Sequence, residues 1–168
     1  SGPVSSTTGS GVVVADTAAG GDISVTTGSV TAMTAGRSAI FVDSVSTTAD
    51  VTIVANGALG AGGDAVRAVL RDGATGNVAV TTRAAVTGEN GIVAVNLGTG
   101  STTVTADGLI TATGTGVFAT AVEGNVTVVA GDVTADGPVG IQAMVEPGGT
   151  GDLSVTAGNV SGGIGILA

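Results

Sequence analysis

Residues 124–143 read GNVTVVAGDVTADGPVGIQA, and this stretch decides the fold. It contains three short apolar segments, at 124–128, around Val133 and at 140–143, separated by Gly, Ala and Asp. Within each segment the apolar residues alternate with a period of two, which is typical of half-buried β-strands and not of helices. The stretch therefore predicts three short strands joined by tight turns.

The same three segments recur along the whole chain. The first segment begins with a small residue and then Asp, Asn or Ser, and continues with an apolar residue and Val or Ile. It stands at 21–25, 49–53, 76–80, 100–104, 124–128 and 151–155, roughly 24 to 28 residues apart. The second falls at Val30, Leu59, Val86, Leu109, Val133 and Val160. The third stands at 39–42, 65–68, 91–94, 116–119, 140–143 and 165–168, and a partial copy at 11–14 precedes the first repeat. We therefore interpret residues 1–168 as a single repeat domain.

Nearly identical three-strand repeats are best satisfied by stacking, so that equivalent strands pair in parallel. The sequence thus predicts an all-β fold, a parallel β-helix (β-solenoid) of about six to seven three-strand coils that each rise about 4.8 Å. Equivalent residues then form columns. One predicted inward column contains Val25, Ile53, Val80, Val104, Val128 and Val155, and a second contains Ile40, Val66, Ile92, Val117, Ile141 and Ile166.

Two other columns are predicted to lie at turns or to face solvent. The turn column Asp22, Asp50, Asn77, Ser101, Asn125 and Asp152 is expected to cap turns and to form a polar ladder. The third-strand column Phe41, Arg67, Val93, Phe118, Gln142 and Leu167 has no consistent chemistry, which favours an outward position. Loops longer than the minimal repeat, in the first two repeats and near 146–149, are expected to carry any binding specificity.

Composition excludes several classes of protein. The net charge is −9, from thirteen acids and four arginines, and a nucleic-acid-binding protein needs a positive surface. There is no Cys or His, which excludes disulfides and thiolate metal sites, and the mean hydropathy of +0.59 is too high for a disordered chain. No stretch approaches the ~20 apolar residues of a membrane helix, and residues 1–4 do not read as a signal peptide. We expect any export signal or membrane anchor to lie outside this chain.

The repeat pattern of G-[DN]-hydrophobic-x-Val, a hydrophobic strand, then G-I-x-A resembles the passenger region of bacterial autotransporters and related large β-helical surface adhesins. The resemblance extends from about Gly11 to Ala168 and implies right-handed coils displayed outside Gram-negative cells. It also implies adhesion to host-cell or neighbouring-cell surface molecules, and attachment to the outer membrane through another part of the protein. The chain stops within a repeat, at 166–168, which favours a longer parent protein.

Enzymatic function is not expected. Polysaccharide lyases and hydrolases need clustered carboxylates and often aromatic platforms, whereas here the acids are spread through turns and Trp, Tyr, His and Lys are missing. The charges at Asp64, Arg67, Arg71 and Asp72 are interpreted as a surface ion-pair group. The segment 60–66 resembles a calcium-binding nonapeptide but has no second copy nine residues later, so we expect a Gly-rich turn. We therefore predict no catalytic residue, no cofactor and no metal site.

Two further functions stay open. Outward threonines of the first strand form a candidate surface-binding array that resembles the Thr-x-Thr arrays of β-solenoid antifreeze proteins: Thr26, Thr52, Thr81, Thr103, Thr105, Thr127 and Thr156. Threonine is, however, also a favoured outward residue of any strand. In addition, both ends of a solenoid expose unpaired strand edges, so copies of this chain could stack end to end into a filament.

Overall fold

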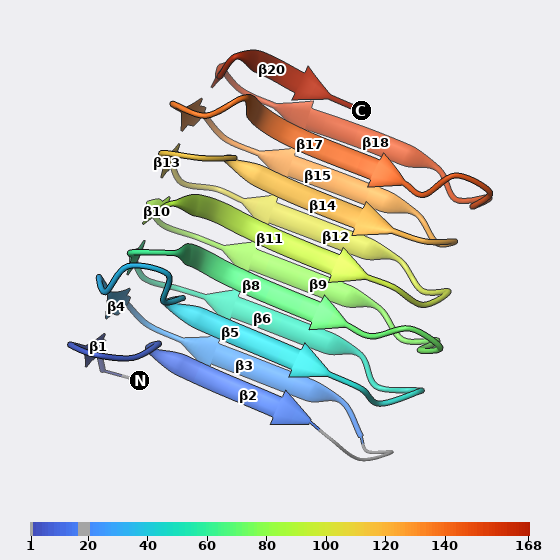
Figure 1. Cartoon of the computed structure of the whole chain (residues 1–168), viewed down its shortest axis with the longest axis horizontal. Helices are drawn as coiled ribbons and strands as arrows, with labels where there is room; N and C mark the ends of the chain where they lie inside the picture. The colour runs from blue at the N-terminus through green and yellow to red at the C-terminus, as the bar shows by residue number, and fades with distance from the viewer. Residues whose placement is uncertain (1, 17–20) are drawn as a thin grey trace.

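A computed structural model describes residues 2–16 and 21–168. These residues form twenty β-strands and no helix (Figure 1). Every strand pairing is parallel, and no two strands that follow one another in the chain are paired. The predicted all-β parallel solenoid is confirmed.

The strands form three sheets. The first sheet contains β3 (Ile23–Thr27), β6 (Val51–Ala55), β9 (Val78–Thr82), β12 (Thr102–Ala106), β15 (Val126–Ala130) and β18 (Leu153–Ala157). The second sheet contains β1 (Val4–Ser6), β4 (Val30–Ala32), β7 (Leu59–Ala61), β10 (Val86–Gly88), β13 (Ile110–Ala112), β16 (Val133–Ala135) and β19 (Val160–Ser161). The third sheet contains β2 (Val12–Asp16), β5 (Ile40–Ser44), β8 (Asp64–Leu70), β11 (Asn90–Asn96), β14 (Val117–Ala121), β17 (Val139–Val145) and β20 (Ile164–Leu167).

Each coil contributes one strand to each sheet. Six complete coils follow a partial coil made of β1 and β2, in agreement with the predicted number. In Figure 1 the strands of the third sheet run from left to right in front, those of the first sheet return behind them, and the chain rises from the N-terminus to the C-terminus. This path is a right-handed coil, the hand that parallel crossover connections almost always take.

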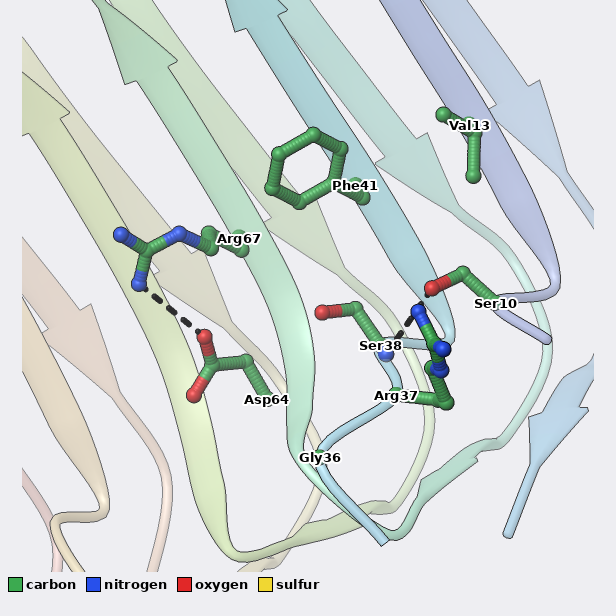
Figure 2. A pocket seen from close by; sticks show the side chains of 8 residues that line it. All are labelled: Ser10, Val13, Gly36, Arg37, Ser38, Phe41, Asp64 and Arg67. Atoms are coloured by element: carbon green, nitrogen blue, oxygen red, sulfur yellow. Dashed lines mark hydrogen bonds and ion pairs between the residues drawn. The ribbon is translucent and has the colours of Figure 1, made fainter. Parts of the chain in front are cut away.

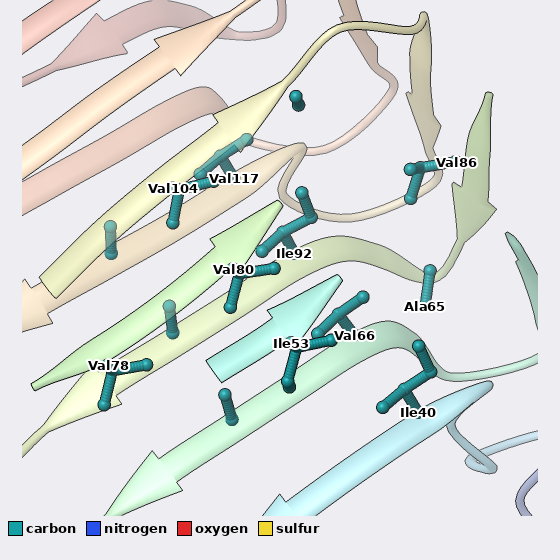
Figure 3. Packing of buried hydrophobic residues seen from close by; sticks show 14 of the residues in the cluster. Ile40, Ile53, Ala65, Val66, Val78, Val80, Val86, Ile92, Val104 and Val117 are labelled. Atoms are coloured by element: carbon teal, nitrogen blue, oxygen red, sulfur yellow. The ribbon is translucent and has the colours of Figure 1, made fainter. Parts of the chain in front are cut away.

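The interior consists of the predicted apolar columns. Val104 pairs with Val80 on one side and with Val128 on the other, and the three side chains are 1 %, 0 % and 0 % exposed in chain order. Figure 3 shows how Val104 and Val80 approach Val117 and Ile92 of the third sheet across the axis. Burial of each such side chain contributes roughly 1.5 to 3 kcal/mol before the entropy of ordering is subtracted. In the last coil Ile166 is 46 % exposed, because a coil packs on only one side of it.

One assignment within the repeat was wrong. The second segment of the fourth copy was placed at Leu109, but Ile110 is the residue that pairs with Val86 and Val133, while Leu109 is 48 % exposed. Both neighbours are apolar, so the sequence pattern fits either of them. The ladder decides, because a slip of one residue would turn the whole strand inside out. The pattern also missed β1, which is the second-sheet strand of the partial coil and pairs with β4.

The predicted polar ladder is present at the turn before the first strand. Each side chain accepts a hydrogen bond from the backbone N–H of the equivalent residue in the next coil: Asp50 N to Asp22 Oδ1 (3.0 Å), Asn77 N to Asp50 Oδ1 (2.7 Å), Ser101 N to Asn77 Oδ1 (2.9 Å), Asn125 N to Ser101 Oγ (3.1 Å) and Asp152 N to Asn125 Oδ1 (2.7 Å). These bonds satisfy backbone donors that the strand ladders leave unpaired and tie every turn to the next.

The abundance of glycine follows from the stacking of coils and not from tight turns. Among the described glycines only Gly36, Gly73 and Gly148 have a positive φ, so tight turns do not explain their abundance. A Cβ on the glycine that opens a repeat would collide with the carbonyl oxygen of the equivalent residue one coil earlier, as at Gly100 against Gly76 and at Gly124 against Gly100. The small residue of the repeat is therefore required by close approach of backbones.

The two faces of β12 give a direct test of the columns. Val104→Asp would bury a carboxylate among apolar side chains and is expected to cost about 3 kcal/mol or more, whereas Thr103→Asp on the outer face is expected to cost less than about 0.5 kcal/mol. The residues paired with Thr103, Ala79 and Thr127, carry no charge that would repel it. Urea unfolding followed by circular dichroism measures both variants. Equal destabilisation would contradict the assigned faces.

Candidate functional site

The outer face of the first sheet gathers all seven threonines predicted as a binding array. The register forms two adjacent outward columns: Ser24, Thr52, Ala79, Thr103, Thr127 and Ser154, then Thr26, Val54, Thr81, Thr105, Val129 and Thr156. Their side chains are exposed or half-buried, and none is charged. Ideal strand geometry spaces such positions about 4.8 Å apart between coils and about 6.7 Å along each strand. The array is thus a flat, uncharged lattice of short side chains.

The outer face of the third sheet is chemically mixed. Its central column runs from Val13 through the predicted solvent-facing residues, in the order Phe41, Arg67, Val93, Phe118, Gln142 and Leu167. The register confirms that these positions are equivalent. Val93 nevertheless is only 8 % exposed. It lies between Arg67 and Phe118, whose longer side chains flank it at the spacing of neighbouring strands, so an outward position does not guarantee contact with water.

An open hollow of about 460 Å³ lies at the lower end of this face (Figure 2). It is lined by Ser10, Val13, Gly36, Arg37, Ser38, Phe41, Asp64 and Arg67. The residues come from β2, β5, β8 and the segments before β2 and β5, so three stretches of the sequence, 10–13, 36–41 and 64–67, meet there. Sequence analysis did not single out Arg37 as a site residue. The sequence signal that could have identified Arg37 is its position in the first repeat, which is longer than the minimal repeat.

The backbone around Arg37 is fixed although the segment is a loop. Gly36 has a φ of 70°, a conformation that side chains disfavour, and this turn lets the Arg37 N–H donate to Thr34 O at 3.0 Å. The Arg37 carbonyl accepts a bond from Gly63 N–H at 3.0 Å, which ties the turn to the next coil. Next to it, the Ser38 N–H donates to Ser10 Oγ at 3.3 Å.

Two ion pairs lie on the third sheet. Arg67 Nη1 contacts Asp64 Oδ2 at 3.3 Å, as the predicted ion-pair group requires. Arg71 instead binds Asp43 of the preceding coil with two hydrogen bonds, from Nε at 2.7 Å and from Nη2 at 2.6 Å. The sequence predicts one surface ion-pair group of Asp64, Arg67, Arg71 and Asp72, which does not include Asp43. The parallel stack brings the carboxylate of Asp43, which lies 28 residues earlier in the chain, into bidentate contact with the Arg71 guanidinium.

The ion pair shifts the titration of both partners. The hydrogen bonds from Arg71 lower the pKa of the Asp43 carboxyl below its ordinary value of 3.8; partial burial opposes this, and the charges of Arg71 and Arg67 reinforce it. The same hydrogen bonds raise the pKa of Arg71. Since the folded state depresses the pKa of Asp43, the pair stabilises the fold above the ordinary carboxyl pKa and loses this contribution as the pH falls through the lowered value.

This linkage gives a pH-dependent prediction. Thermal unfolding of the wild-type chain and of Asp43→Asn should differ most near pH 7, and the two curves should converge as the pH falls below 3.8 through the range where Asp43 takes up its proton. Asp136→Asn, which removes one acid away from the pair, provides the matched control. A melting-temperature difference that stays constant from pH 7 to acid would show that the Asp43–Arg71 pair makes no contribution.

The candidate calcium segment 60–66 forms β7, a turn and the start of β8. Gly62 and Gly63 pack there against the backbone of the preceding coil, where a Cβ on Gly62 would meet Thr34 O. Across residues 2–16 and 21–168, no three His, Cys, Asp or Glu side chains gather in a geometry that could hold a metal ion. Within the same ranges no helix has the length and apolar character needed to cross a bilayer.

Comparisons with models of protein families, with curated proteins and with solved structures find no match for this chain.

Proposed function

We propose that this chain is a structural and adhesive segment of a bacterial secreted or cell-surface protein, in which it acts as a rigid acidic rod that presents a binding surface. The observation that carries the proposal is the uninterrupted register of three parallel sheets through every coil. Each interior strand is hydrogen-bonded on both sides, and the core columns continue from coil to coil. Such a stack grows by about 4.8 Å per coil without changing its cross-section.

The charge distribution suits this role. The acids stand mainly in turns at the edges of the sheets, as the polar ladder shows for Asp22, Asp50 and Asp152. A net charge of −9 on a Val-rich β-protein keeps copies apart by repulsion. The rod therefore stays soluble while its outer sheet faces remain accessible.

The bacterial location rests on the repeat pattern. Its resemblance to autotransporter passengers supports display outside the cell, attachment to the outer membrane through another part of the parent protein, and partners on host or neighbouring cells. The absence of Cys fits export before folding, because no disulfide has to form on the way. The proposed role is non-enzymatic: the segment spaces and presents a surface.

Removal of one complete coil tests the rod. Deleting residues 100–123, which contain β12, β13 and β14, joins Thr99 to Gly124 and lets Val80 pair with Val128 in the register that Val104 now occupies. We expect a folded chain with one cooperative unfolding transition, shorter by about 4.8 Å in X-ray scattering. Deleting only residues 100–111 is the matched control and should disrupt folding, because the remaining half-coil cannot continue all three sheets. Failure of the whole-coil deletion to fold would contradict a modular spacer.

A filament is favoured by one observation at the end of the stack. Taken as a separate chain, residues 1–168 expose Leu153, Ile164 and Ile166 of the last coil by 38 %, 49 % and 46 %, together with one edge of each sheet. End-to-end stacking of copies would cover both. Analytical ultracentrifugation of the wild-type chain tests this. Stacking requires the sedimenting mass to grow with protein concentration, and a mass that stays that of a monomer would contradict a filament.

Ice binding is the other candidate, favoured by the uncharged lattice on the first sheet. A repeating array of hydroxyl and methyl groups can order water on a flat face, and long charged side chains would disturb that order. If the array binds ice, the wild-type chain should show thermal hysteresis, and Thr103→Lys with Thr127→Lys should abolish it. Thr111→Lys, on the outer face of the second sheet, should leave it intact. Absence of hysteresis in the wild type would exclude this function.

A further inference from the structure

Positive charge is concentrated at one place in an acidic chain. Of the four arginines, Arg37, Arg67 and Arg71 lie on or beside the outer face of the third sheet, whereas Arg83 directly follows β9 of the first sheet. Arg71 is held by Asp43 through two hydrogen bonds and serves the fold. The other two guanidinium groups lie at the hollow (Figure 2).

Arg37 and Arg67 both retain donors for a ligand. Arg37 is exposed, and within the described residues no carboxylate lies within 4.0 Å of its guanidinium. Arg67 is 44 % exposed and uses one nitrogen for Asp64 at 3.3 Å. Asp64 also has a second hydrogen-bond partner, because its other oxygen accepts a bond from Asn90 Nδ2 at 2.8 Å. A guanidinium has five N–H groups in a planar fork that matches a carboxylate, so most of this capacity remains.

An aromatic ring and a hydroxyl complete the hollow. Phe41 stands between Arg67 and Val13 in the outward column, and its half-buried ring offers an apolar surface beside the charged groups. Ser10 Oγ accepts a bond from Ser38 N–H, which uses a lone pair and not the hydroxyl proton. A flat apolar surface with Arg37 and Ser10 on one side and Arg67 on the other matches a pyranose ring with a carboxylate on one side and hydroxyls at its rim.

We propose that this hollow binds a saccharide that carries an isolated carboxylate, with the carboxylate at Arg37, an apolar face of the sugar ring against Phe41, and Arg67 donating to ring hydroxyls on the far side of Phe41. The proposal rests on the proposed adhesive function and names the class of ligand for it. The loop that carries Arg37 belongs to the longer first repeat, where the backbone bonds of the Gly36 turn hold it in place before a ligand arrives.

The overall charge restricts the ligand further. A net charge of −9 repels polyanions, and Asp43 and Asp64 lie beside the arginines. At physiological salt, repulsion from charges more than about 8 Å away is largely screened, and Asp64 lies on the Arg67 side of the hollow, so one carboxylate at Arg37 is still attracted. A glycan with dispersed acidic sugars therefore fits better than a nucleic acid or a densely sulfated polymer.

The direct test is an NMR titration of the full chain with methyl glucuronide. We expect a Kd on the order of 1 mM, with chemical-shift changes concentrated at Ser10, Arg37, Ser38 and Arg67. Methyl glucoside, the neutral counterpart, should bind at least about tenfold more weakly, because it lacks the carboxylate that the Arg37 guanidinium recognises. Acetate and inorganic phosphate provide the anion without the ring and should also bind about tenfold more weakly.

Matched variants assign the roles. Arg37→Gln with Arg67→Gln should weaken methyl glucuronide at least about tenfold, while Arg83→Gln, an arginine outside the hollow, should change its affinity less than twofold. Phe41→Ala should weaken the glucuronide but not acetate, and Phe118→Ala, the other aromatic residue of the same column, should affect neither. Unchanged melting temperatures would confirm that the variants remain folded.

Three outcomes would overturn the proposal: equal affinities for acetate and methyl glucuronide, equal losses in the Arg83 and double variants, or shifts away from the hollow. None of them bears on the rod itself, which stands or falls with the whole-coil deletion. A chain that tolerates that deletion but does not bind the glucuronide would retain the spacer role and lose only this ligand.

Discussion

The structure depends on parallel strands pairing in register about 4.8 Å apart, which places each residue over its equivalent in the coil below. Each side chain must therefore pack against the equivalent side chains of the coils above and below it. Branched aliphatic residues meet this condition well, as in the column that contains Val80, Val104 and Val128. Because equivalent positions meet the same requirement in every coil, the sequence repeats. This constraint also explains why glycine opens the repeats, since Gly100 faces the backbone of Gly76 where a Cβ has no room.

The same constraint determines how polar groups are accommodated. Inside the stack Asn96 is fully buried, yet its Nδ2 donates to Gly76 O at 2.9 Å and its Oδ1 accepts from Gly98 N–H at 2.9 Å. Thr102 is also buried, and its hydroxyl donates to Thr120 O at 2.8 Å. At the turns, the neutral acceptors Asn77, Ser101 and Asn125 separate Asp22 and Asp50 from Asp152, so only one pair of ladder carboxylates is held one coil apart.

Departures from the repeat mark the surfaces that can carry function. The first sheet keeps two uniform outward columns, whereas the third sheet varies from Phe41 to Arg67 to Val93 along one column. Where the first repeat is longer, its added loop brings Arg37 beside that variable column and creates the hollow. A solenoid can change its outer face without disturbing its core, because alternate residues of a strand point to opposite sides. Rigid coils and locally adapted faces are thus compatible in one chain.

The sequence by itself determined the fold class, the number of coils, both core columns and the polar ladder, because each is a repeated pattern of short-range chemistry. It also predicted the outward threonines, since strand alternation fixes the face of a residue such as Thr103. Register decided between Leu109 and Ile110, and only the stacked coils joined Asp43 to Arg71 and brought Arg37, Phe41 and Arg67 to one hollow. These features depend on contacts between coils, and residues some 23 to 30 positions apart in the chain become neighbours only when one coil packs on the next.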